Sequence, residues 1–328
     1  MHNKILLSIG IPVYNQAGTI KETIEGILSQ SLAPFEIVVS ENHSTDGTFD
    51  VLREFGNAIK IVQPPEHCTI AANWNHCVRS CSGTWVGLCS GDDILLPNYV
   101  TEVTHAISSH KDAVFVMGGW EILNESTGKI ESHYLLSMSK ITKPPKTIEM
   151  NLAGPKAAFA AFAFKREAFD RIGGYRENYQ TFPDYVLQFD LAPLGDFIKI
   201  DKCIARYRSS QIRPSLERER GARLLKERIH FAGKTIWNAL EHGVPHLQVK
   251  KAAVIHLKQL TEYIKRTDFK PDLEQQAKLE AAMSKAGFSP LSQSNPSFGD
   301  VPLRSMRFVK GKIRKVITRW KDLSKSIS

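Results

Sequence analysis

Two adjacent carboxylates, Asp92 and Asp93, are the residues of this sequence whose type and place point most directly to chemistry. They follow an apolar run and a glycine. Paired carboxylates beside a buried strand are costly unless a cation or hydrogen-bond donors neutralise them. Mg²⁺ or Mn²⁺ would do so, since both prefer oxygen ligands and readily bind a diphosphate as well. The alternative is a turn and helix N-cap ahead of Pro97, where Asp is common. Taken alone, the pair favours neither interpretation.

The segments that must position these carboxylates alternate between strand and helix patterns. Apolar runs predict strands at 5–13, 35–39, 59–62 and 85–89. Apolar residues at helical spacing predict a helix after a Thr19–Glu22 capping box, one after the polar turn 44–48, and one over 70–81 capped by Thr69. Such alternation predicts an α/β fold whose mainly parallel sheet has helices on both faces.

Polar residues that follow each predicted strand are the next to consider, because ligands of open parallel sheets bind beyond the carboxyl ends of the strands. Residues 12–15 follow the first strand, Glu41 the second, and Asp92 and Asp93 the fourth. Glu41 therefore adds a third carboxylate to one edge of the sheet. An acid there can accept the N3–H of a uracil-type base, whereas its plain alternative is an exposed turn residue.

Four motifs then occur in a characteristic order. They are PVYN at 12–15, VVSENHSTDGT at 38–48, NWN at 73–75 and LCSGDD at 88–93. In this order and spacing the sequence resembles the family 2 glycosyltransferases over roughly residues 5–210. The resemblance implies a GT-A fold, which is Rossmann-like, and the helical pattern beyond residue 210 adds a helical C-terminal extension.

The resemblance also implies a set of site residues. It assigns the metal, Mg²⁺ or Mn²⁺, to Asp92 and Asp93. Residues expected to contact a nucleotide diphosphate sugar are Pro12, Tyr14, Asn15, Glu41, Asn73, Asp92 and Arg208. The family's catalytic base follows a Gly-Gly-aromatic turn, and residues 173–175 and 182–185 are similar, which places Asp184 in that role. The bland alternative for Asp184 is a helix N-cap.

The implied reaction is an inverting transfer of a sugar to a hydroxyl of a glycan or a lipid-linked glycan, with Asp184 as general base. The sequence departs from the family pattern at three positions. Ser90 replaces the first Asp of the Asp-x-Asp element, Pro183 replaces a Glu before Asp184, and Ser210 replaces a His near Arg208. These departures keep open a second interpretation, a nucleotide-sugar-binding protein without turnover. The Gly-x-Gly-x-x-Gly of dinucleotide oxidoreductases is absent after the first strand.

Charge and composition divide the chain. We predict a catalytic domain at 1–210, a helical extension at 211–290, and a linker with a basic amphipathic helix at 291–328. Residues 301–328 hold nine Lys or Arg against one Asp, so they carry nearly all of the net charge of +9. This pattern predicts contact of residues 304–327 with an anionic membrane. Docking of the helix on the protein's own body is the alternative, and no nucleic-acid partner is expected.

The expected location is cytoplasmic, at the inner face of the cell membrane. The N-terminus shows no export signal, and five cysteines fit reduced thiols better than a disulfide framework. A peripheral enzyme at that surface would reach lipid-linked acceptors, as in bacterial surface-polysaccharide assembly.

Overall fold

The computed structural model describes residues 6–152 and 154–209, and then a broken set of residues between 223 and 256. All of these belong to one unit of the chain, Met1–Ser289. The strands are β1 (Leu7–Val13), β2 (Glu36–Glu41), β3 (Lys60–Val62), β4 (Trp85–Leu88), β5 (Ile94–Leu95), β6 (Ala113–Asn124), β7 (Ile130–His133), β8 (Ile141–Thr142), β9 (Phe162–Lys165) and β10 (Asp196–Ser209). The helices are α1 (Ile20–Leu28), α2 (Thr48–Arg53), α3 (Ile70–Ser80), α4 (Tyr99–Ser108), α5 (Lys146–Asn151), α6 (Arg166–Arg171) and α7 (Pro183–Leu191), with 3-10 turns η1 (Gly56–Ala58) and η2 (Phe159–Ala161).

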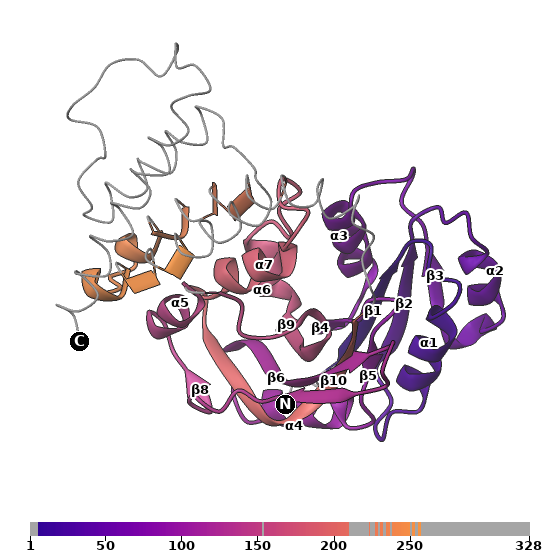
Figure 1. The fold of residues 1–328 in the computed structure, drawn as a ribbon, viewed down its shortest axis with the longest axis horizontal. Coiled ribbons are helices and arrows are strands. Elements are labelled where there is room, and N and C mark those ends of the chain that lie inside the picture. The colour runs from indigo at the N-terminus through magenta and orange to yellow at the C-terminus, as the bar shows by residue number, and fades with distance from the viewer. Residues whose placement is uncertain are drawn as a thin grey trace, which may run out of the picture. The chain divides into compact units, whose positions relative to one another are not determined.

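These strands form one mixed sheet in the order β3-β2-β1-β4-β9-β6-β10-β5, with β7 on β6 and β8 on β10 (Figure 1). Strands β3, β2, β1 and β4 are parallel to one another. Strand β9 runs antiparallel to both β4 and β6, and β10 is parallel to β6. The sheet is therefore mainly parallel, which confirms the predicted fold class, and the carboxyl ends of β1, β2 and β4 share one edge.

Two hydrophobic clusters cover the two faces of the sheet. Alternate residues of β1, such as Ile9 and Ile11, join Ile24 of α1 and Val103 of α4 on one face. The opposite face carries α3, α6 and α7, whose buried residues pack on the inward side chains of β4, β6 and β9. Side chains in a strand alternate between faces, so a sheet with helices on both sides needs nearly continuous apolar strands. Strand β1, buried along its whole length, meets this requirement.

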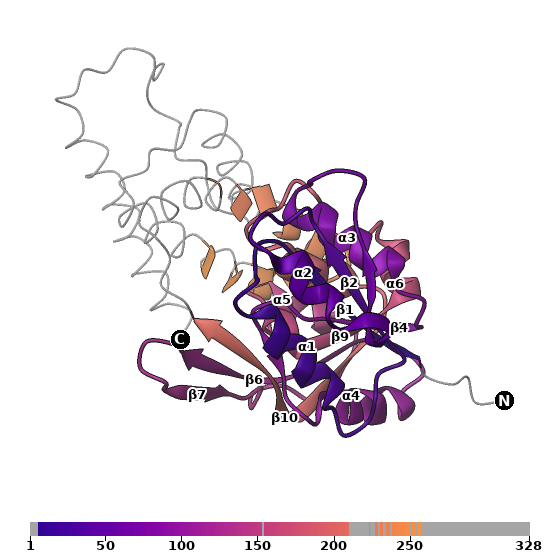
Figure 2. The same ribbon diagram turned by 90° about the vertical axis from the view of Figure 1, so that its right-hand side faces the viewer.

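Strand β10 is long enough to serve two parts of the molecule. Its first residues lie beside the first half of β6, a register shift follows between Lys199 and Ala205, and its last residues run along the second half of β6. In Figure 2 the β6–β7 hairpin and the neighbouring end of β10 project from one side of the sheet. This projecting end carries Arg208.

Several local predictions are confirmed and two are wrong. The four predicted N-terminal strands and the helices after them form close to their expected bounds, and Thr69 caps α3 by accepting the Ala72 N–H (3.4 Å). The Thr19 side chain, however, makes no capping hydrogen bond at α1. The nearly apolar run at 157–164, whose composition also predicts a strand, forms one only from Phe162, because a 3-10 turn occupies the residues before it.

Predictions for the C-terminal part fall largely outside the described residues. Between 223 and 256 the described residues are helical apart from a turn at 242–245. The basic helix at 304–327, the linker and the domain boundaries near 210 and 290 lie outside what is described, and they stay predictions. Among the described residues, no helix has the length and apolar character that crossing a bilayer demands.

Candidate functional site

The turn that carries Asp92 and Asp93 lies directly after β4. It is closed by the Asp93 N–H, which donates to the Ser90 carbonyl (3.1 Å). Asp93 is only 3% exposed, whereas Asp92 is partly exposed. Helix α4 begins later, at Tyr99, with Asn98 at its N-cap position. The alternative interpretation is therefore right about the turn and wrong about the helix N-cap.

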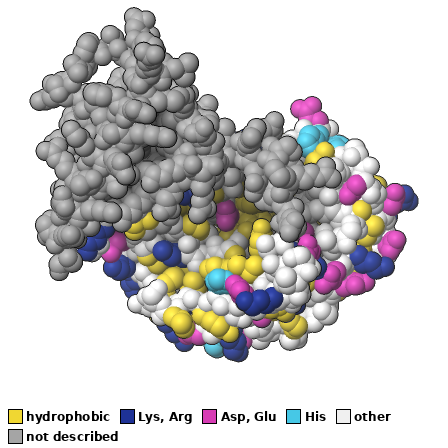
Figure 3. Space-filling view, viewed as in Figure 1, with side chains coloured by type: hydrophobic (Ala, Val, Ile, Leu, Met, Phe, Trp, Pro, Cys, Tyr) yellow, Lys and Arg dark blue, Asp and Glu magenta, His cyan; other side chains and the backbone are white. Residues whose placement is uncertain are grey.

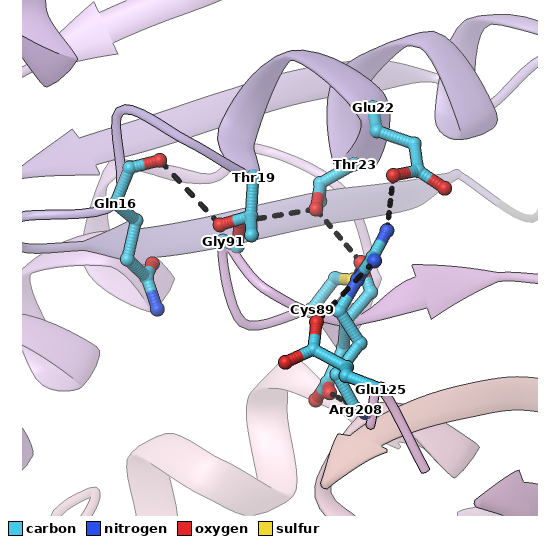
Figure 4. Close-up of polar contacts among 9 residues, drawn as sticks. Gln16, Thr19, Glu22, Thr23, Cys89, Gly91, Glu125 and Arg208 are labelled. Carbon is cyan, nitrogen blue, oxygen red and sulfur yellow. Dashed lines mark hydrogen bonds and ion pairs between the residues drawn. The ribbon is translucent and has the colours of Figure 1, made fainter. Parts of the chain in front are cut away.

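Two threonines of α1 hold this turn from the neighbouring element. The Thr19 hydroxyl donates to the Gly91 carbonyl (2.9 Å), and the buried Thr23 hydroxyl donates to the carbonyl of Asp93 (2.8 Å). Figure 4 shows both hydroxyls directed at the turn. The Thr19 hydroxyl is thus engaged in a tertiary contact, which explains why the predicted capping box does not form. Neither threonine was expected at the site, since only a Thr-x-x-x-Thr spacing on one helix face hints at this role.

Gly91 lies in close contact with residues 13–16. A Cβ at this position would stand 2.2 Å from Gln16 Oε1 and 3.0 Å from Val13 Cγ2. We expect Gly91→Ala to destabilise the protein by about 1–3 kcal/mol, as overpacking of a filled site does, and to displace the turn. Gly18→Ala is a matched control, because a Cβ there meets nothing within 4 Å. Urea unfolding checks this, and equal midpoints for the two variants would contradict it.

The environment of Asp93 disfavours its charge. Burial raises the pKa of Asp93 to about 8, the neighbouring Asp92 adds to the rise, and Arg208 opposes it. The carboxylate accepts one long hydrogen bond, from the Arg208 backbone N–H (3.4 Å). Burial likewise raises the pKa of the Cys89 thiol, and the Asp93 charge adds to it, so this thiol stays neutral and is no nucleophile.

Arg208 reaches the same corner from the end of β10. Its guanidinium pairs with Glu22 of α1 and stands 3.6 Å from Glu125, which follows β6 (Figure 4). The structure thus brings Arg208, a predicted donor-binding residue, next to Asp93, a predicted metal ligand. In this arrangement the guanidinium is paired with two exposed carboxylates, and a bound diphosphate would have to compete with them.

Glu41, at the end of β2, is 1% exposed and organises the loop that follows it. Its carboxylate accepts the N–H groups of His43 (3.1 Å) and Ser44 (2.6 Å) and the side-chain amide of Gln63 (2.6 Å). Burial alone would raise the pKa of Glu41, but these hydrogen bonds outweigh it and lower the pKa below its ordinary value. Glu41 is therefore charged at neutral pH and is not an exposed turn residue.

The loop after β1 meets the loop after β2. The Asn15 N–H donates to Ser44 Oγ (2.9 Å), and the Asn15 side-chain carbonyl accepts the Thr45 N–H (2.8 Å). Tyr14 is 44% exposed, and its ring lies 4.6 Å from that of His67. The exposed Tyr14 ring offers an aromatic surface at this edge of the sheet. His67, which lies in the loop after β3, was not foreseen.

Pro12 and Asn73 occupy the interior beneath these loops. Pro12 is buried in β1 beside Ser40 of β2. The Asn73 carbonyl accepts the Ser40 hydroxyl (2.7 Å), and the Asn73 amide donates to the Ser40 carbonyl (3.2 Å). Asn73 is buried, so its amide ties α3 to β2. Their assignment to donor binding stays a prediction.

Asp184 is the second residue of α7, after Pro183 in the first turn. The side chain is partly exposed, yet enough protein surrounds it that burial raises the pKa of Asp184 to about 6. Hydrogen bonds from the backbone N–H groups of Tyr185 and Asp184 itself oppose the rise. A carboxyl with this pKa can be deprotonated at neutral pH and can still take up a proton, as a general base must. In Figure 3 hydrophobic side chains gather in the middle of the described part of this face.

The Gly-Gly-Tyr turn ahead of α7 is anchored by Asn75 of α3. The Asn75 carbonyl accepts the Tyr175 N–H (2.7 Å), and its amide donates to the Tyr175 carbonyl (2.8 Å). Gly174 has φ 86°, and a Cβ there would stand 2.5 Å from Asn75 Oδ1. The Tyr175 hydroxyl is buried without a hydrogen-bond partner among the described residues, and burial together with the Asp184 charge raises the pKa of Tyr175. Asn75 lies in one of the four motifs, but its role was not foreseen.

The site residues thus fall into three groups. One joins the loops after β1 and β2 through Asn15 and Glu41. The second joins the turn after β4 to Arg208. Asp184 forms the third, and its described contacts link it to Tyr175 and α7 rather than to the other two groups.

Comparison with known proteins bears directly on this arrangement. The sequence profile described as glycosyl transferase family 2 matches residues 8–173, just over half of the chain. The chain belongs to glycosyl transferase family 2. The matched stretch of this family 2 glycosyltransferase contains the loops after β1, β2 and β4, together with Asn75, and it ends at the first glycine of the Gly-Gly-Tyr turn. It ends before Asp184 and Arg208.

One relative of this family 2 glycosyltransferase is the UDP-Glc:α-D-GlcNAc-diphosphoundecaprenol β-1,3-glucosyltransferase WfgD of Escherichia coli. The two are 28% identical over 141 residues, which cover 42% of this chain and 55% of WfgD. The chain spans about half or less of the length of the curated relatives it matches.

Two solved structures share the fold. One is TarS 1–349 of S. aureus in complex with UDP-GlcNAc, at 14% identity and a TM-score of 0.62 over 86% of this chain and 80% of that one. The other is the mannosyltransferase PcManGT of Pyrobaculum calidifontis in complex with GDP-Man and Mn²⁺, at 18% identity and a TM-score of 0.50 over 88% and 82%. These likenesses show the GT-A fold of the family 2 glycosyltransferase.

The carboxylates after β4 suit a divalent cation only together with other ligands. Among the described residues, no three His, Cys, Asp or Glu side chains gather in a way that would hold a metal. Mg²⁺ and Mn²⁺ sites in phosphate-binding enzymes are often completed by substrate oxygens and water, with one or two carboxylates from the protein. Asp93, buried with a single long hydrogen bond, and Asp92, which makes no hydrogen bond or ion pair among the described residues, fit that pattern.

Proposed function

We propose that this chain is an inverting glycosyltransferase that moves a sugar from a nucleoside diphosphate sugar to a hydroxyl of a glycan or lipid-linked glycan. One observation carries the proposal: a buried carboxylate, Asp93, stands beside Asp92 after β4 with too few partners to stabilise its charge. Family membership and the name of the relative that glucosylates a diphosphoundecaprenol-linked sugar support this substrate class. A non-catalytic nucleotide-sugar-binding protein is the second candidate, favoured by Ser90, Pro183 and Ser210.

The donor would be held by the first two groups of residues. The exposed ring of Tyr14 and the loop shaped by Glu41 and Asn15 would hold the nucleoside. Asp92 and Asp93 would hold a Mg²⁺ or Mn²⁺ ion against the diphosphate, and that ion supplies electrostatic stabilisation of the leaving group. Arg208 would add a positive charge once the diphosphate displaces Glu22 and Glu125.

Transfer would then need a single displacement. Asp184 takes the proton of the acceptor hydroxyl, and the hydroxyl oxygen forms a bond to the anomeric carbon from the face opposite the diphosphate. The bond between that carbon and the diphosphate oxygen breaks, and its electron pair leaves with the nucleoside diphosphate. One displacement inverts the anomeric configuration, and no covalent intermediate with the protein is required.

A thermal-shift screen tests donor binding. We expect one of UDP-glucose, UDP-N-acetylglucosamine or GDP-mannose to raise the melting temperature, and to do so only with MnCl₂ or MgCl₂ present. At a ligand concentration about 100-fold above Kd the stabilisation would be about 2.7 kcal/mol. Unsubstituted UDP and GDP serve as controls for the nucleotide. Stabilisation that is the same with EDTA would contradict the assigned role of Asp92 and Asp93.

A further inference from the structure

The chain that leads into α7 is held by a carboxylate from much later in the sequence. Glu227 Oε1 accepts the N–H of Gln180 (2.9 Å), and Glu227 Oε2 accepts the N–H of Thr181 (2.9 Å). Glu227 is 6% exposed. A buried carboxylate that accepts two successive N–H groups fixes two peptide planes at once, and each bond is of the stronger, charge-assisted kind.

Aromatic residues on both sides reinforce this contact. The Tyr179 hydroxyl lies 3.2 Å from His230 Nδ1, and the two rings are stacked with centroids 5.6 Å apart. Phe231, which is fully buried, packs edge-on against the rings of Phe182 and Tyr185. Residues between 179 and 185 therefore contact Glu227, His230 and Phe231 through polar and apolar contacts alike.

The C-terminal end of α7 also contacts the described residues that follow position 223, here called the later segment. The buried Asp190 carboxylate pairs with Arg176 (2.5 Å) and with Lys234 (2.9 Å). Asp190 thereby joins the Gly-Gly-Tyr turn, α7 and residue 234 in one ionic cluster. The later segment touches α7 near both ends, although it lies beyond the stretch that matches the family profile.

We propose that Glu227 is a positioning residue that sets the path of residues 180–181 into α7 and so fixes where the Asp184 carboxylate stands. The inference rests on the proposed function of Asp184. Thr181 lies three residues before Asp184, and only Phe182 and Pro183 separate them. A proton acceptor must meet its hydroxyl within hydrogen-bond reach, and a misplacement of about 1 Å can cost roughly 100-fold in rate. Glu227 would thus affect the rate of turnover and not the affinity for the donor.

Glu227→Gln tests the clamp with little change in size. A Gln side chain offers one acceptor and one donor, so its amide would face one of the two N–H groups and break that bond. We expect hydrogen exchange at the amides of Gln180 and Thr181 to rise at least about tenfold. We also expect kcat to fall roughly 10- to 100-fold, with the Kd of UDP-glucose or UDP-N-acetylglucosamine in MnCl₂ unchanged. Glu227→Asp, which keeps both oxygens, should recover part of the rate.

Glu241→Gln is the matched control, because Glu241 is exposed in the same segment and should change neither exchange nor turnover. Unchanged exchange at residues 180 and 181 in Glu227→Gln would overturn the proposal without any substrate. Equal losses of donor binding and turnover, or loss of the folded circular dichroism spectrum, would assign Glu227 to general stability and overturn it too. The proposed function fails by a different result, namely undiminished turnover in Asp184→Asn.

Discussion

Replacement of Asp184 by Asn should lower turnover by roughly 10²- to 10⁴-fold, the usual contribution of a general base, and leave donor binding intact. The reason is that Asn keeps the size of the side chain but cannot accept the proton of the acceptor hydroxyl. Turnover can be measured as UDP released from UDP-glucose or UDP-N-acetylglucosamine with a GlcNAc-diphosphoundecaprenol acceptor. Binding can be measured separately by calorimetry.

Asp170→Asn controls for the loss of one negative charge nearby, because Asp170 is an exposed carboxylate of α6. A wild-type chain that binds a donor but releases no product with any glycan acceptor would favour the binding-protein alternative. If Asp184→Asn turned over as fast as wild type, Asp184 would not be the general base.

Titration of Asp184 should make both the activity and the stability of the protein depend on pH. The pKa of Asp184 is about 6 in the folded chain against an ordinary 3.8, so charging it costs folding free energy. That cost is absent below about pH 4 and grows as pH rises from 4 to 6. We therefore expect kcat/KM to fall below pH 6, where the base is protonated. We also expect Asp184→Asn to unfold at a higher urea concentration than wild type at pH 7. Its free energy of unfolding should be larger by about 1–2 kcal/mol, after allowance for the partial exposure of residue 184.

Asp93→Asn should abolish the metal-dependent part of donor binding and lower kcat/KM by roughly 100-fold or more, the effect expected when a main source of electrostatic stabilisation is lost. An amide cannot match a carboxylate as a partner for Mg²⁺ or Mn²⁺. The thermal shift produced by a nucleotide sugar, measured with MnCl₂ and with EDTA, should become the same in the two conditions.

Asp92→Asn is the informative companion, because Asp92 is the more exposed member of the pair. If both carboxylates hold the ion, the two variants should behave alike. Asp112→Asn, immediately before β6, is the control for an unrelated exposed carboxylate. A metal-dependent shift that survives in both Asp92→Asn and Asp93→Asn would place the cation elsewhere.

The parts of the fold that are local in sequence could be predicted. Strands β1 to β4 follow from apolar runs, and the polar residues after them reach one edge because parallel strands share a direction. The position of Asp92 and Asp93 in a turn rather than at a helix N-terminus depended on where α4 begins. Pro97 can stand either in a first helical turn or before it, so the sequence left both interpretations open.

Contacts made across the fold could not be predicted. Thr19 satisfies the local pattern of a capping box, but a carbonyl of the turn after β4 competes successfully for its hydroxyl. The contacts of Asn75, although it lies in a motif, and of Glu227 could not be read from the sequence, since their partners are backbone groups 100 and about 47 residues away. The sequence does not predict β10 as a single strand, because a register shift interrupts the alternation of its buried and exposed side chains.

The place of β10 in the sheet has a practical consequence for any attempt to produce the catalytic part alone. The family profile ends at residue 173, yet β10 lies inside the sheet between β6 and β5. A fragment cut at the end of that match would leave β6, a long and largely buried strand, as an open edge with unpaired N–H and C=O groups. Exposed apolar edges of this kind pair with other chains, so such a fragment would form aggregates rather than a smaller enzyme.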